Sequence, residues 1–206
     1  MIRNYFFELL KTYTSDVNLI VDLWEEIEFY YKNPSRNYHN LDHLNYMLNA
    51  ILQVKIKILN WDAVMFAIYY HDIIYDIFKN NNEEKSADFA EVRLKKLKLS
   101  NQQIDEIKKH ILSGKTHQNS ENSDRKYFLD ADLSILGESP EIYSKYSKNI
   151  RAEYVQIPFQ IYKTARTNIL NDFLNRTQIF LTPYFYQKFE DTARRNIINE
   201  IEFLKE

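Results

Sequence analysis

Apolar residues recur along most of the chain at spacings of three and four, which is the period of an amphipathic α-helix. Residues 17–30 show one such apolar face, and Ser15 or Asp16 directly before it suits the first cap of a helix. Residues 61–75 are apolar nearly all round, which is typical of a helix buried on every side. We therefore expect residues 61–75 to form a central helix.

The breaks in this pattern coincide with residues that begin or end helices. Further helices are predicted to begin at Asn40, within 81–84, at Ser100 with Gln103 in capping-box form, at Ser139-Pro140 and at Thr182-Pro183. Gly114 and Pro158 are expected to end helices or separate them. No repeat or shift in composition marks a boundary, so we expect eight to ten helices in a single compact all-α bundle over residues 1–206.

Composition narrows the functional classes. Hydrophobic residues make up 45% and charged residues 27% of the 206, the balance of a folded chain. The net charge is -2 and the basic residues form no blocks, so the sequence does not indicate binding to duplex nucleic acid. With only 2 glycines, the chain cannot form a glycine-rich phosphate-binding loop. With neither a secretory pattern in residues 1–11 nor an apolar run of membrane length, we expect a cytoplasmic protein that does not bind membranes.

The chain has no cysteine, so any metal ligand must be a histidine or a carboxylate. All of the histidines fall in the middle of the chain, at positions 39, 43, 71, 110 and 117. An ordinary surface role is the simpler interpretation of any single one, but the set favours a site. Imidazole with carboxylate suits a divalent ion such as Mn, Mg, Fe, Co, Ni or Zn.

The strongest candidate is His71-Asp72, two ionisable residues within the apolar segment. Burying an unpaired charge is costly, and a metal ion would offset that cost. The alternative is a pair that simply caps the end of the helix. Asp130 and Asp132 stand two residues apart in another apolar segment, which suggests one direct ligand and one neighbour that positions it. The alternative here is a pair of acids at the start of a helix.

His43, His71-Asp72 and Asp132 occur in the order H…HD…D, which resembles the signature of the HD superfamily of metal-dependent phosphohydrolases. The flanking segments are also similar to one bacterial branch of that superfamily. These segments are 38–43 (YHNLDH), 71–76 (HDIIYD), 82–87 (NEEKSA), 129–137 (LDADLSILG) and 150–154 (IRAEY), with Arg166, Arg176 and 193–196 (ARRN) further on.

The resemblance implies an HD-domain-like fold, with the metal-site core at about 36–140 and the helices of 140–206 packed on it. It implies four metal ligands, namely His43, His71, Asp72 and Asp132. His43 fits the first position because a hydrophobic residue follows it four places on. His39 could instead orient His43, contact the substrate or be the first ligand itself.

Family members with two metals carry extra histidines between the HD pair and the final aspartate. One such position, beside Glu83, is occupied here by Asn82, which favours a single divalent metal ion. His110 and His117 are further contributors to consider, His117 with more support because its surroundings resemble a histidine-bearing stretch of the family.

The implied reaction is hydrolysis of a phosphate ester by a metal-activated water. Glu83 is the candidate that positions or deprotonates this water, and Asp76 is a weaker one. Arg151, Arg166 and Arg176 are candidate clamps for the phosphoryl group, although a plain salt bridge suits each of them equally. The substrate would be a small phosphate ester, and a nucleotide is one form of it.

Three other interpretations are open. The chain could be a regulatory module that binds metal or nucleotide without turnover, or an oxygenase with a pair of irons, as a minority of HD-fold proteins are. It could also be a purely structural bundle. A homodimer is a further open expectation.

Overall fold

The computed structural model describes residues 1–118 and 120–205. In this part of the chain every regular element is helical, which confirms the predicted all-α class, and no helix there is both long and apolar enough to cross a membrane. The contacts divide the chain into two compact units, residues 1–129 and 130–206. The expectation of one domain over 1–206 stays a prediction.

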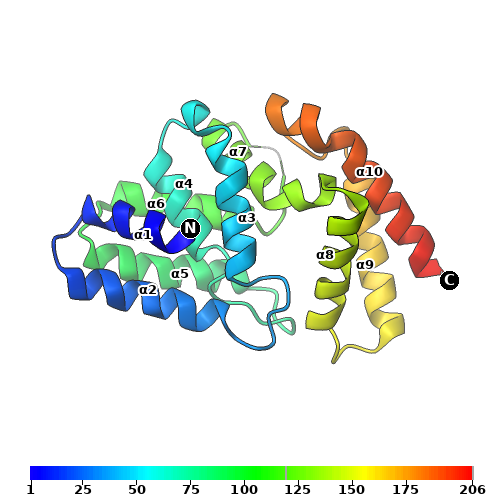
Figure 1. Ribbon diagram of the computed structural model, residues 1–206, viewed down its shortest axis with the longest axis horizontal. Helices are drawn as coiled ribbons and strands as arrows, with labels where there is room; N and C mark the ends of the chain where they lie inside the picture. The colour runs from blue at the N-terminus through cyan, green and yellow to red at the C-terminus, as the bar shows by residue number, and fades with distance from the viewer. Residues whose placement is uncertain (119, 206) are drawn as a thin grey trace. The chain divides into compact units, whose positions relative to one another are not determined.

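Among its described residues the first unit, blue to green in Figure 1, holds seven of the helical elements and the start of an eighth. These are α1 (Ile2–Lys11), α2 (Val17–Tyr31), α3 (Leu41–Leu52), the 3₁₀ helix η1 (Lys55–Lys57), α4 (Trp61–Tyr70), α5 (Asn82–Lys96), α6 (Asn101–Ser113) and the first part of α7 (Ser123–Leu133). Helix α4 contacts α3, α5 and α6, and its residues 63–70 are all buried. The prediction of a central buried helix is thus confirmed.

Capping residues that were predicted from the sequence explain where several of these helices begin or end. The Asp16 carboxylate accepts from the backbone N–H groups of residues 18 and 19, and so begins α2. Ser100 and Gln103 form the predicted capping box of α6, which ends next to Gly114. Helix α5 begins at Asn82, within the predicted range, although the Asn81 side chain before it makes no cap hydrogen bond.

The predicted extent of the central helix was wrong. It ends at Tyr70, and residues 71–75 form turns. The carbonyl groups of Asp72 and Ile73 accept from the Arg36 guanidinium, and the backbone N–H of Ile74 donates to the Ser86 hydroxyl. These side chains replace the bonds that a continued helix would make, so the backbone is satisfied without it.

The second unit, yellow-green to red in Figure 1, consists of the end of α7 followed by η2 (Ser134–Gly137), α8 (Pro140–Glu153), α9 (Phe159–Leu174) and α10 (Pro183–Lys205). Helix α10 packs on η2 and α9. A side chain on Gly137 would place its Cβ 2.4 Å from that of Phe189, so only glycine permits this approach of η2 to α10. Ser139 caps α8 with proline at its first turn, as predicted.

Candidate metal centre

Two helix ends of the first unit carry the histidines of the candidate site. His43 lies in the first turn of α3, whose cap, the Asn40 side chain, accepts from the His43 backbone N–H at 3.4 Å. His71 directly follows the last residue of α4. Both imidazoles are buried, with 3% and 4% of their surface exposed. Two ionisable rings are therefore held away from solvent.

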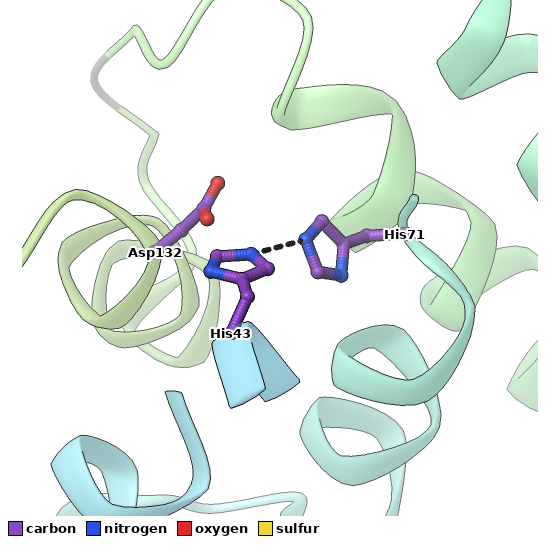
Figure 2. Close-up of side chains that lie close together, drawn as sticks. All are labelled: His43, His71 and Asp132. Atoms are coloured by element: carbon purple, nitrogen blue, oxygen red, sulfur yellow. Dashed lines mark hydrogen bonds between the residues drawn. The ribbon is translucent and has the colours of Figure 1, made fainter. Parts of the chain in front are cut away.

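The ring nitrogens of these histidines face one another, as the dashed line in Figure 2 shows. His43 Nε2 lies 3.2 Å from His71 Nε2. His71 Nδ1 lies 3.0 Å from the carbonyl oxygen of Ile68, and because a carbonyl can only accept, Nδ1 carries the proton and donates. In the neutral ring His71 Nε2, which faces His43, then carries the lone pair, and this is the tautomer that a metal ligand requires.

Asp72 brings a carboxylate to the same point. Its Oδ2 lies 3.0 Å from His71 Nε2 and 3.9 Å from His43 Nε2, and 19% of its side chain is exposed. Ligand atoms bound about 2.1 Å from one ion lie about 3.0 Å apart at a right angle and about 4.2 Å apart when opposite. The three distances, 3.0, 3.2 and 3.9 Å, fall within this range. The three atoms therefore fit the coordination sphere of a single ion.

Asp132 lies near the end of α7, the helix through which the division between the two units passes. One ligand atom from each of His43, His71 and Asp132 lies within 4.8 Å of the others, and Figure 2 shows these side chains together. This group could hold a metal ion, with two neutral nitrogen donors and an anionic oxygen donor. The set contains no soft ligand, so its chemistry suits the borderline and hard divalent ions.

His39 lies beside these ligands in the first unit. Its ring centroid is 4.3 Å from that of Tyr75 and 5.7 Å from that of His43. His39 precedes α3, whereas His43 faces His71, so the geometry supports His43 as the ligand and His39 as its neighbour.

His117 is half-buried after the end of α6, in the left-handed backbone region with φ of 48°. His110 is fully buried on α6, and its ring lies 6.1 Å from that of Phe128. Neither of its ring nitrogens has a hydrogen-bond partner among the described residues. Burial lowers the pKa of His110 to about 4, so the ring is neutral at physiological pH.

The two candidates for the proton-transfer step differ in their surroundings. Glu83 lies in the first turn of α5, is half-buried, and makes no hydrogen bond or ion pair within the described chain. The Asp76 carboxylate instead accepts from the backbone N–H of Phe78 and is exposed. Asn82 accepts from the backbone N–H of Asp76 and donates to its carbonyl, so its amide is committed to a local turn.

Asp130, predicted to position Asp132, has both carboxylate oxygens engaged within the second unit. Oδ1 accepts from the backbone N–H of Leu181 at 2.7 Å, and Oδ2 accepts from the N–H and hydroxyl of Thr182 at 2.7 and 2.6 Å. Burial raises the pKa of Asp130 to about 7, although these hydrogen bonds oppose the rise. Asp130 thus anchors the segment that leads into α10.

The candidate phosphate clamps of the second unit have protein partners. Arg166 is buried and pairs with both oxygens of Glu200 at 2.8 and 3.0 Å, so it forms the salt bridge that was the alternative for it. Arg151 donates to the carbonyls of Tyr154 and Ile157, which closes the turn after α8. The Arg176 guanidinium lies 4.5 Å from the Phe173 ring centre, and burial lowers its pKa.

Arg36 is the residue that the sequence analysis missed. It is buried, and its guanidinium donates to carbonyls of both segments that carry the histidine ligands. The only sequence signal is an arginine two residues before the 38–43 segment, which by itself indicates nothing specific.

Comparisons of the chain with protein-family models, with curated proteins and with solved structures found no match. The resemblance to the HD superfamily stays a prediction.

Proposed function

We propose that this chain is a metal-dependent phosphohydrolase that cleaves a small phosphate ester. The observation that carries the proposal is the convergence of His43 Nε2, His71 Nε2 and Asp72 Oδ2 at 3.0 to 3.9 Å, together with the grouping of Asp132 with the same two histidines. Histidine and aspartate ligands of this kind suit ions that activate water. A nucleotide is the specific substrate form that we propose to test first.

A divalent ion bound here would polarise a phosphoryl oxygen and lower the pKa of a bound water. The chain's own residues hold this chemistry in place. The Ile68 carbonyl fixes the His71 tautomer, and the Asn40 cap fixes the first turn of α3 beside His43.

Glu83 is proposed to accept the proton that the attacking water gives up. Its carboxylate has no described partner that would compete for this role. Asp76 is the weaker candidate, since its carboxylate is already engaged with Phe78.

The test incubates the purified chain, loaded separately with Mn, Mg, Fe, Co, Ni or Zn, with p-nitrophenyl phosphate, 5′-nucleotides and cyclic nucleotides. The assay measures released phosphate, or nucleoside monophosphate where the substrate is a cyclic nucleotide. We expect turnover with at least one metal and its loss in Asp72→Asn. Asp42→Asn is the matched control, because Asp42 is an exposed acid on α3 next to His43.

Glu83→Gln separates the roles within the site. We expect it to lower kcat by about 10²-fold to 10⁴-fold, the usual range for a general base, while metal affinity stays unchanged. Metal binding without turnover of any substrate would contradict the enzyme proposal and favour a regulatory module that binds metal without catalysis. Two irons per chain would favour the oxygenase instead.

A further inference from the structure

Arg36 is a buried cation, with 8% of its surface exposed, in the segment that leads into α3. Its guanidinium donates to carbonyl oxygens only: that of His39 at 3.2 Å, that of Asp72 at 2.7 Å and that of Ile73 at 2.9 Å. Within the described chain no carboxylate is among its partners. This is unusual, because a buried arginine is generally paired with an acid.

Two aromatic rings complete the surroundings of this guanidinium. Its central carbon lies 4.9 Å from the ring centre of Tyr31 and 5.5 Å from that of Tyr75. The Tyr31 hydroxyl also accepts from the backbone N–H of Asp72 at 3.3 Å. Ring faces attract a cation, so Arg36 is stabilised without a neutralising acid.

The three carbonyl groups belong to two separate stretches of chain. His39 lies four residues before His43, whereas Asp72 is itself a candidate ligand and Ile73 follows it. A planar guanidinium can span both stretches at once, since its N–H groups point outward in a fixed fork. The spacing between the ligand atoms of His43 and His71 depends on how these two stretches are held together.

We propose that Arg36 is the positioning residue of the metal site. It holds the turn that carries His71 and Asp72 against the segment that leads into α3, and so sets the distances between the ligand atoms before an ion binds. This inference rests on the metal site of the proposed function. Partners that orient metal ligands usually change metal affinity by about 10-fold to 100-fold when they are removed.

The test measures binding of Co(II) to the chelator-treated protein by its visible absorption and by calorimetry. In Arg36→Lys the charge remains but the fork is lost, and we expect Kd to rise by about 10-fold to 100-fold, with an altered Co(II) spectrum. Arg93→Lys is the matched control. Arg93 also covers a ring, that of Phe89, and pairs with Glu26, but it makes no hydrogen bond to residues 36–43 or 71–75.

We expect Arg93→Lys to lower stability while leaving Kd within about twofold of the wild type. Arg36→Lys with the wild-type Kd and spectrum would overturn the positioning role while leaving the metal site intact. A wild type that binds no Co(II), Mn or Zn would overturn the proposed function itself.

If Arg36→Lys is unfolded without metal, refolding is repeated over a series of Co(II) concentrations. The proposal is supported if the variant regains helical circular dichroism only at a Co(II) concentration higher than the one that saturates the wild type. Failure to fold at any Co(II) concentration would overturn it, because Arg36 would then serve the fold alone.

Discussion

His110 offers a quantitative test of burial in the first unit. Its side chain is fully buried and both ring nitrogens are without a hydrogen-bond partner in the described structure. A buried polar group without a partner costs roughly 1 to 3 kcal/mol. Leucine has a similar volume and no polar atom, so we expect His110→Leu to raise the free energy of unfolding at pH 7 by roughly 1 kcal/mol or more.

The effect should grow as the pH falls. Burial lowers the pKa of His110 from 6.5 to about 4, helped by nearby Arg125 and opposed by Asp124. The unfolded chain therefore binds more protons than the folded chain between these values, and stability is lost as the pH falls below 6.5. From pH 7 to pH 5, one such group removes about 2 kcal/mol, at 1.36 kcal/mol for each unit of pKa difference.

Urea unfolding of the wild type and of His110→Leu at pH 7 and at pH 5 measures this difference. We expect the advantage of the leucine variant to be larger by about 2 kcal/mol at pH 5 than at pH 7. An equal advantage at both pH values, or a His110 imidazole that titrates near 6.5 in the folded protein by NMR, would refute the reasoning.

Three further changes test the fold. Asp124→Ala removes the acceptor of the backbone N–H groups at 59 and 60, at 2.9 and 2.6 Å, and should cost about 2 to 4 kcal/mol in urea unfolding. Gly137→Ala should lower the free energy of unfolding by at least about 2 kcal/mol because of the clash with Phe189. The control Gly114→Ala, whose Cβ would lie 3.2 Å from its nearest neighbour, should lower it far less. Equal losses in the two variants would contradict the clash. Ser100→Ala should lower the free energy of unfolding by about 1 kcal/mol through loss of the capping box, and an unchanged midpoint would contradict it.

The helix boundaries show which features of the fold can be predicted from neighbouring residues in the sequence. The cap at Asp16, the capping box at Ser100 and the proline at the start of α8 all act within one turn, so they can be recognised from neighbouring residues. The end of α4 could not be recognised in this way. It depends on bonds from Arg36 and Ser86, which are distant in sequence, and apolar residues continue past Tyr70 as if the helix did.

The sequence by itself determined the all-helical class and most of the caps, and its resemblance to the HD superfamily pointed to His43, His71, Asp72 and Asp132 as metal ligands. Helical period and residue chemistry are local properties, so a single sequence displays them. Only the tertiary structure decided that the ligand atoms of the two histidines face each other, that Arg166 forms a salt bridge with Glu200, and that the buried Arg36 joins the two ligand-bearing segments. Those facts depend on which distant side chains meet, and no local pattern records that.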